Sequence, residues 1–534
     1  MQKNISLRLL PKEASDDAVI KEYIAQSLAI KNNLVTGFYR VKQSIDARSK
    51  QVWITLTVKA FIDEPFLLRD VEKILLKDVS HVKHNVIIIG AGPAGLFAAL
   101  KLIEQGIKPI ILERGKDVRA RRRDLALLNK EGIINTESNY CFGEGGAGTY
   151  SDGKLYTRSS KRGDVNRILN TFVQFGAEEK ILYEAHPHIG TNKLPHIITS
   201  IREQIIHCGG EIFFEKKVVD FIVEDQTVKG VKTHDNNIFH GDAVIVATGH
   251  SARDIFELLH QKNILIEAKP FALGVRVEHP QSLIDSIQYH CARRSEFLPP
   301  ASYSLVEQVN DKGVFSFCMC PGGIIAPAST NTNELVVNGW SPSKRNNPYA
   351  NSGIVVQVEM KDVINYFKEQ QKKNPKSAFC NLQSNELLLM QFQKVVEQNA
   401  YSAGGEKFVA PAQRLVDFYS NKISPTLPDC SYLPGVKSAD LTNVFPSFIH
   451  TSLRHAFKSF GKKMHGYFTN EAIVVATESR TSSPVRIPRN ENNLHHPQIK
   501  NLFPCGEGAG YAGGIVSAAM DGEKVASAIT VLLK

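Results

Sequence analysis

Three pairs of side chains have types and spacings that could support redox, acid–base or anion-binding chemistry. The first pair is Cys318 and Cys320. Positions i and i+2 of a strand share a face, so the two thiols are expected to point together. Such a pair is either a redox or substrate-contacting site or two buried groups that pack as small hydrophobic side chains. No second pair stands at ligand spacing, so no metal site is predicted.

The other two pairs are histidines and arginines. His186 and His188 share a face if the chain is extended there, and an imidazole titrates near neutral pH, so one of them could transfer protons. Arg480 and Arg486 bracket the segment TSSPV, and a guanidinium fork suits a carboxylate substrate. The alternative for each is a hydrogen-bonded structural side chain or a surface charge. The catalytic residues stay unknown, with His188, Cys320 and Arg480 as candidates.

The segment VIIIGAGPAG has the spacing of a dinucleotide-binding turn. After a hydrophobic run, Gly90 would allow the tight turn, Gly92 the approach of a pyrophosphate, and Gly95 close helix–strand packing. A helix pattern follows, and its first N–H groups would receive the phosphates. A second strand pattern ends at Glu113, where a carboxylate binds ribose hydroxyls. Because that acid disfavours a 2′-phosphate, the segment indicates FAD or NAD rather than NADP.

Two further glycine-rich stretches share a pattern, FGEGGAGTYSDG at 142–153 and CGEGAGYAGGIVSAAMDG at 505–522. The second stretch runs into a helix pattern near Gly513 and Gly514, where side chains would obstruct a bulky ligand. We expect Glu507 to face the ribityl or ribose hydroxyls of that ligand, and the upstream stretch to cover its other side. Two unrelated glycine loops are the alternative.

Several stretches together resemble known flavoproteins. DAVIVATGHSA (242–252) and the C-terminal glycine-rich stretch resemble the second and third signatures of FAD proteins built like glutathione reductase or p-hydroxybenzoate hydroxylase. With HPHIGTNKL, PFALGVRVEHPQ, FCMCPGG and ESRTSSPVRI, they resemble a bacterial family of FAD-dependent dehydrogenases. Asn192 stands where the family pattern has Asp, so this chain lacks a carboxylate at that position. The resemblance implies FAD as the cofactor and names no substrate.

The residues expected to bind the cofactor come from these stretches, together with Val218, where the resemblance implies that backbone groups hold the adenine. They are Gly90, Gly92, Pro93, Ala94, Gly95, Glu113, Arg114, Gly145, Gly146, Thr149, Val218, Ala247, Thr248, Gly249, Gly506, Glu507, Gly513, Gly514 and Ile515.

The elements that must position these residues indicate an α/β fold. Alternating strand and helix patterns predict a Rossmann-type FAD/NAD(P)-binding domain over 81–265, completed by 490–534. A mixed α+β substrate or cap domain is expected at 266–489, inserted between the two parts. Residues 1–80 have the pattern of a small β-α-β-β module. Within the inserted region, helices are expected near 383–397 and 452–475.

The composition of the 534-residue chain is that of an ordinary globular protein, with 43% hydrophobic and 22% charged residues. No apolar run approaches the about 20 residues of a membrane span, and the first residues lack the apolar segment of a signal peptide. Eight scattered cysteines are typical of a reducing compartment. We therefore expect a cytoplasmic protein with no membrane partner.

The net charge of +10 and pI near 9.0 raise the question of an anionic partner. The densest basic cluster is VRARRRD at 118–124, which is either a solvated helix face or a phosphate or nucleic-acid contact. We favour the solvated face, so a nucleic-acid partner is not expected.

These observations predict a FAD-dependent oxidoreductase, a dehydrogenase that transfers a hydride between FAD and an unidentified small organic substrate. The chain has no second GxGxxG, so NAD(P)H or another electron donor or acceptor would visit the flavin transiently. The alternatives are a flavin-dependent RNA-modifying enzyme and a non-catalytic flavin-binding protein.

Overall fold

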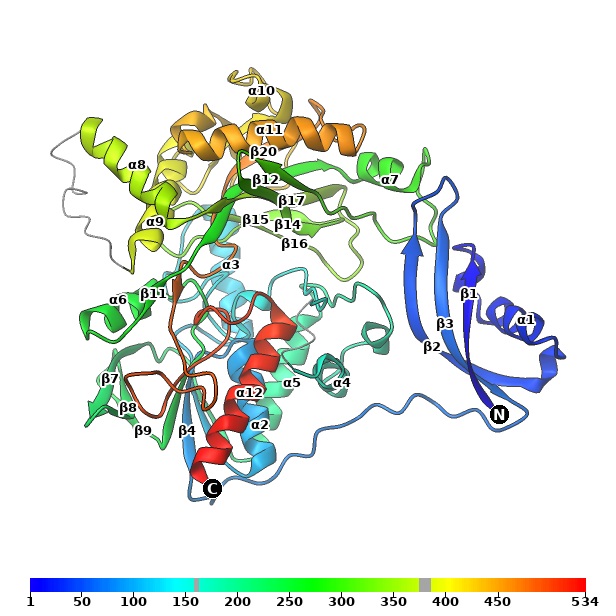
Figure 1. The fold of residues 1–534 in the computed structure, drawn as a ribbon, viewed down its shortest axis with the longest axis horizontal. Coiled ribbons are helices and arrows are strands. Elements are labelled where there is room, and N and C mark those ends of the chain that lie inside the picture. Colours follow the sequence, from blue (N-terminus) through cyan, green and yellow to red (C-terminus); the bar gives the residue numbers. More distant parts are fainter. Residues whose placement is uncertain (158–162, 374–385) are drawn as a thin grey trace.

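The computed structural model describes residues 1–157, 163–373 and 386–534 (Figure 1). Within these residues, no helix has both the length and the apolar composition needed to cross a membrane.

A five-stranded parallel sheet carries the predicted dinucleotide turn. Its strands follow the order β22-β10-β4-β5-β6. The sequence order changes direction between β4 and β10, and in open α/β sheets such a switch point is where ligands bind. Strand β4 is almost wholly buried, as expected for a parallel strand covered on both faces. The strands are β4 (Asn85–Ile89), β5 (Lys108–Leu112), β6 (Glu211–Phe213), β10 (Ala243–Val246) and β22 (Leu502–Pro504).

Helices α2 (Pro93–Gln105) and α12 (Ile515–Leu533) lie side by side against this sheet, although they are far apart in the sequence (Figure 1). Their contact is close because Gly522 has no side chain: a Cβ there would stand 2.1 Å from the Ala94 carbonyl oxygen. The C-terminal segment therefore returns to the first βα unit. Helix α4 (Val165–Gln174) contacts α12, and α5 (Leu194–His207) contacts α2. Helix α3 (Val118–Glu131) follows β5 in the chain.

An antiparallel meander of three strands precedes β10. It is a separate sheet in the order β7-β8-β9, whereas β10 belongs to the parallel sheet. The meander consists of β7 (Val218–Glu224), β8 (Thr227–Thr233) and β9 (Ile238–His240), and helix α6 (Arg253–Gln261) follows β10.

A seven-stranded mixed sheet forms the second large layer, at the top of Figure 1, in the order β13-β14-β17-β12-β20-β18-β19. Its strands are β12 (Phe271–Pro280), β13 (Val306–Val309), β14 (Lys312–Cys320), β17 (Tyr349–Val358), β18 (Ala410–Arg414), β19 (Val436–Ser438) and β20 (Ile473–Glu478). The short pairs β11 (Glu267–Ala268) with β21 (Val485–Arg486), and β15 (Ile324–Pro327) with β16 (Val337–Trp340), complete the strands of this part.

The helices beside the mixed sheet differ from the expected positions. Helix α9 runs over Leu388–Gly404, later than the expected 383–397, of which 383–385 lie outside the described residues. Helix α11 runs over Ser447–Lys463 rather than 452–475, because Pro446 fixes its start and β20 begins soon after its end. The remaining helices are α7 (Gln281–Tyr289), α8 (Met360–Lys373) and α10 (Leu415–Tyr419).

The N-terminal segment has the β-α-β-β order that its sequence predicts. Strands β1 (Gln2–Leu9), β3 (Trp53–Ile62) and β2 (Val35–Asp46) form one antiparallel sheet, and α1 (Asp17–Leu28) begins after Asp16, whose side chain accepts from the Ala18 N–H. An extended stretch then leads to β4 (Figure 1).

Candidate functional site

A long cavity opens at the carboxyl ends of the parallel strands, where an α/β sheet binds its ligands. The turns after β4, β5 and β10 form one wall, and the first residues of α12 form another. The far wall comes from the mixed sheet, through the end of β14 and the segment after β20. The cavity therefore joins the dinucleotide turn to the second large layer.

Most of the residues expected to bind the cofactor line this cavity. They are Gly90, Gly92, Pro93, Ala94, Glu113, Arg114, Gly146, Val218, Ala247, Thr248, Gly249, Glu507, Gly513, Gly514 and Ile515.

Four expected residues instead support the walls from behind. A Cβ at Gly95 would stand 2.0 Å from the Gly90 carbonyl oxygen, so this glycine permits close helix–strand packing. Gly145 donates its N–H to the Ala91 carbonyl, and the buried Thr149 hydroxyl donates to the Glu144 carbonyl. The fourth, Gly506, donates its N–H to Asp521 at 2.7 Å. These residues shape the cavity without lining it.

Glu113 holds three backbone segments together at the end of β5. One carboxylate oxygen accepts from the Ala91 N–H, and the other accepts from the N–H groups of Gly115 and Gly143, each at 2.9 Å. A carboxylate offers about four lone-pair positions, so one position remains for a ribose hydroxyl. The acid therefore organises both glycine-rich turns as well as facing the cavity.

Arg121 organises the stretch around residues 139–149 from behind. Its side chain is fully buried and donates to the carbonyl oxygens of Asn139, Tyr140, Glu144 and Gly146, at 2.7 to 3.0 Å. The expectation of a solvated face for VRARRRD is wrong at this position, although the flanking arginines are exposed. The sequence does contain a signal for the burial of Arg121, because Arg121, Leu125 and Leu128 fall on one face at helical spacing.

The last helix begins where the sequence predicts it. Gly514 precedes the first residue of α12, and Ile515 lines the cavity from the first turn. The preceding loop is fixed by a buried ion pair, in which Arg489 contacts both oxygens of Asp521 at 2.6 and 3.0 Å. Asp521 also accepts a hydrogen bond from the Gly506 N–H, so the ion pair is joined directly to the loop.

The walls have the features of a cradle for a large polar ligand. Cβ atoms at Gly513 and Gly514 would meet no atom within 4 Å, and one at Gly92 would meet only the Gly146 Cα, at 4.0 Å. The hydroxyl oxygens of Thr248 and Ser251 are buried at the cavity without a hydrogen-bond partner among the described residues. Buried polar groups in proteins are normally hydrogen-bonded, so these two are suited to receive a ligand. The residues present therefore fit a dinucleotide.

Basic side chains gather at the end of the cavity near β5 and β7. Lys216 and Lys217 line it and were not predicted from the sequence, although they directly precede Val218. Arg114 also lines it, but its guanidinium is paired with Glu137 at 2.6 Å and Asp254 at 2.9 Å. His250 is a further lining residue that sequence reasoning missed, directly after the Ala-Thr-Gly signature.

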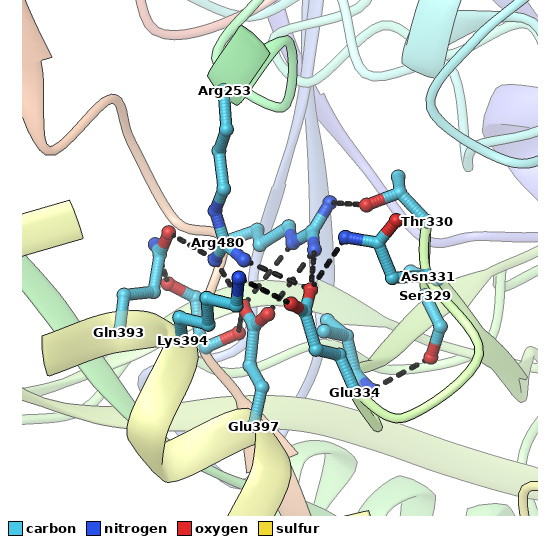
Figure 2. Close-up of polar contacts among 12 residues, drawn as sticks. Arg253, Ser329, Thr330, Asn331, Glu334, Gln393, Lys394, Glu397 and Arg480 are labelled. Carbon is cyan, nitrogen blue, oxygen red and sulfur yellow. Dashed lines mark hydrogen bonds and ion pairs between the residues drawn. The ribbon is translucent and has the colours of Figure 1, made fainter. Parts of the chain in front are cut away.

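Figure 2 shows that Arg480 belongs to a buried ion network rather than standing free. Its guanidinium donates to Glu397 at 3.1 Å and to the Thr330 hydroxyl at 2.8 Å, and Arg253 of α6 donates to the same Glu397 at 2.9 Å. Burial alone would raise the pKa of Glu397, but the charges of Arg253 and Arg480 lower it to about 2. Arg480 also lines the cavity, but its guanidinium is already paired with Glu397, so a substrate-binding role for it stays a prediction.

The two candidate histidines lie outside the cavity lining. His188 contacts the Ser343 carbonyl oxygen at 3.1 Å, and burial together with the Arg345 charge lowers its pKa to about 4. It is therefore neutral near pH 7. His186 is exposed and packs edge-on against Tyr156. Neither position supports the proton-transfer role that the sequence suggested.

The two cysteines of FCMCPGG lie at the far wall. Cys318 lines the cavity, whereas Cys320 is buried behind it. The expectation that the thiols point together agrees with the geometry, because both sulfur atoms contact the Lys154 ammonium, at 3.8 and 3.7 Å.

The chain matches three known families. Residues 270–481 match the family described as FAD-dependent protein, C-terminal domain-like, and residues 84–258 match pyridine nucleotide-disulphide oxidoreductase. Residues 1–61 match a domain of unknown function.

Relatives share either the whole chain or one part of it. An uncharacterized protein of Clostridium beijerinckii is 37% identical, over 98% of this chain and 97% of its own length. A thiamine thiazole synthase of Aeropyrum pernix is 26% identical over 32% of this chain and 57% of its own length. The tRNA uridine 5-carboxymethylaminomethyl modification enzyme MnmG of Alkaliphilus metalliredigens is 29% identical over 31% of this chain and 24% of its own length.

Solved structures overlap with this chain only weakly. FqzB aligns with 86% of this chain and 78% of its own at a TM-score of 0.37 and 12% identity. CtdE in complex with FAD aligns with 84% of both chains at a TM-score of 0.32 and 10% identity.

Proposed function

The chain belongs to the same family as its Clostridium beijerinckii relative and contains a FAD-dependent protein domain, and from that premise we propose that it is a dehydrogenase that transfers a hydride between FAD and a small organic substrate. FAD is its cofactor. The observation that carries the proposal is the single cavity that joins the dinucleotide turn to a wall of the mixed sheet. A nucleotide cofactor held at one end would present its reactive ring to the other.

Three groups of residues would hold FAD. Glu113 would accept a ribose hydroxyl at its remaining lone pair, and the first N–H groups of α2, after Gly92, would receive the pyrophosphate. The start of α12 at Gly514 would approach the isoalloxazine ring and stabilise negative charge there. Bound FAD supplies the hydride acceptor, while the protein supplies orientation and electrostatics.

The substrate would lie between the flavin and the mixed sheet. Phe317, Cys318, Asn338 and Thr481 line the cavity at that wall and combine one aromatic face with small polar groups. Such a lining suits a small molecule that is bound through a few directed hydrogen bonds. We propose that the mixed-sheet unit, residues 266–489, acts as the substrate or cap domain. The parallel-sheet unit would comprise 81–265 and 490–534, and residues 1–80 a separate module.

Anaerobic reduction of the purified holoprotein tests this function. NADH, NADPH and pooled metabolites are added in turn while the absorbance of the flavin is followed. We expect at least one organic donor to bleach the flavin rapidly, and reoxidation by an acceptor to restore its absorbance. If no organic donor reduces a flavin that dithionite does reduce, the protein is a non-catalytic flavin binder and the dehydrogenase proposal is wrong.

A flavin-dependent RNA-modifying enzyme is the second candidate. It is favoured by the exposed side chains of Arg119, Arg122 and Arg123 on α3, and by the partial similarity to MnmG. Phosphate contacts of this kind would make tRNA binding weaken steeply with salt. Binding of tRNA at low salt that is lost by 200 mM salt would support this candidate, and absence of binding at low salt would remove it.

A further inference from the structure

Cys318 occupies an irregular point at the end of β14. The pairing of β14 with β17 shifts register between Phe317 and Cys320, and Cys318 has a left-handed backbone with φ of 45°. Residues other than glycine and asparagine rarely adopt that backbone conformation. Bulges of this kind often re-aim a side chain beside an active site. Here the bulged residue is the cysteine that lines the cavity.

A cationic side chain lies against both sulfur atoms. The Lys154 ammonium is 3.8 Å from the Cys318 sulfur and 3.7 Å from the Cys320 sulfur. Its position is fixed by the buried Asp152 carboxylate at 3.0 Å. From the other side, the fully buried Arg276 donates to the Cys318 carbonyl oxygen at 3.1 Å. Arg276 is itself paired with the buried Glu478 at 2.7 Å, so the two thiols lie within a fixed network of buried charges.

These contacts make the two thiols unequal. A hydrogen bond from Cys320, helped by the charges of Lys154 and Arg276, lowers the pKa of the Cys318 thiol well below its ordinary value. The same hydrogen bond and burial raise the pKa of Cys320. A thiolate beside a neutral thiol is the arrangement needed for disulfide formation, because the thiolate is the reactive species.

The other cysteines that the structure describes are placed differently. Burial and neighbouring carboxylates raise the pKa of Cys430 and Cys505, whose surroundings favour an inert thiol. Cys141 also lines the cavity, but its sulfur faces the Ala328 carbonyl oxygen at 3.6 Å. Within the described part of the chain, Cys318 and Cys320 are the cysteines whose sulfur atoms contact the same ammonium group.

We propose that Cys318 and Cys320 form a second redox centre that exchanges two electrons with the flavin held in the adjoining cavity. This inference rests on the proposed function, because it requires FAD to be bound there. The pair lies on the mixed sheet, outside residues 84–258, which match the disulphide oxidoreductase family. It would connect the flavin to a thiol or disulfide substrate entering from the mixed-sheet side.

The exchange balances without a further reactant. The Cys318 thiolate and the Cys320 thiol lose two electrons and one proton as the S–H bond breaks and the S–S bond forms. Bound FAD in its oxidised state would supply the acceptor for the two electrons and that proton. The net charge of the two cysteines and the flavin together is −1 before and after the step. Lys154 remains beside the two sulfur atoms throughout. The reverse reaction reopens the disulfide when the flavin is reduced by another donor.

Anaerobic titration of the holoprotein with dithionite tests the proposal. Starting from air-oxidised protein, we expect four electrons per FAD in the wild type and two in Cys320→Ser. A matched control is Cys430→Ser, which removes a half-buried thiol of the same unit outside the cavity and should keep four. Intact-mass analysis after alkylation gives a readout independent of turnover: the oxidised wild type should take up two labels fewer than the reduced protein.

The outcomes separate this inference from the proposed function. A wild-type protein that binds FAD, takes up only two electrons and keeps both thiols open to alkylation in its oxidised form would overturn the redox pair alone. A protein that binds no FAD would instead overturn the proposed function. Lys154→Met adds a measurement on the FAD-free chain, because removing the ammonium should slow alkylation of Cys318 at pH 7 about tenfold for each unit by which the thiol pKa rises. An unchanged rate would contradict the role given to Lys154.

Discussion

Gly92→Val is expected to yield a folded protein that retains almost no FAD. The backbone at this position has φ of −78° and ψ of −177°, which valine adopts readily. A Cβ there would meet no protein atom closer than the Gly146 Cα at 4.0 Å, so the fold has room for it. The added methyl groups would occupy the space through which a pyrophosphate reaches the first N–H groups of α2. Losing two hydrogen bonds to a charged group costs about 3–6 kcal/mol, which corresponds to at least a hundredfold weaker binding.

The measurement is the ratio of flavin absorbance to protein in purified samples, together with the thermal unfolding midpoint. Gly313→Val is a matched control, because this glycine lies on β14 away from the cavity and a Cβ there would meet nothing closer than 3.5 Å. The control should keep FAD. If Gly92→Val unfolds like the wild type and holds FAD equally well, the phosphate site is wrongly placed.

Arg121→Met is expected to have the second large effect, on stability as well as on FAD retention. Methionine has a similar length but no donor, so the carbonyl oxygens of Asn139 and Tyr140 would lose the donor that Arg121 provides. The carbonyl oxygens of Glu144 and Gly146 would keep only their bonds from Thr149. Each orphaned acceptor costs about 1–3 kcal/mol. For two such acceptors we therefore expect a loss of at least about 2 kcal/mol in the free energy of unfolding, and weakened FAD binding because the glycine-rich stretch would no longer be held.

The neighbouring Arg122→Met provides the control. Arg122 is exposed on the same helix and makes no such network with the residues that the structure describes, so its substitution should change the free energy of unfolding by no more than about 0.5 kcal/mol. Chemical denaturation of both variants, with and without added FAD, checks the prediction. Equal stabilities for the two variants would show that the buried guanidinium does not organise the cavity wall.

The fold class and the cofactor could be predicted from the sequence because their signals are local. Glycines at fixed spacing, a preceding hydrophobic run and a following helix pattern lie within one short segment around Gly90. The return of the C-terminal segment to the same sheet was recognisable from its glycine-rich stretch. The Rossmann-type fold and FAD are confirmed by the parallel sheet and the family matches.

The contacts that decide the roles of single charged residues could not be predicted in this way. Arg480 was proposed for substrate binding, but its partner Glu397 lies on a different element far away in the sequence. A single sequence contains no signal for such a pairing. The bulge that turns Cys318 toward the cavity is likewise a property of strand register, which depends on β17 and not on the local residues.

The most direct test of the account is the identity of the ligand that the purified protein holds. Heat release followed by chromatography and absorbance spectroscopy of the supernatant separates FAD from FMN and NAD. We predict FAD at about one molecule per chain, either after purification or after adding it to the FAD-free protein. Recovery of FMN or NAD instead, or a folded protein that neither contains FAD nor takes it up, would contradict the account.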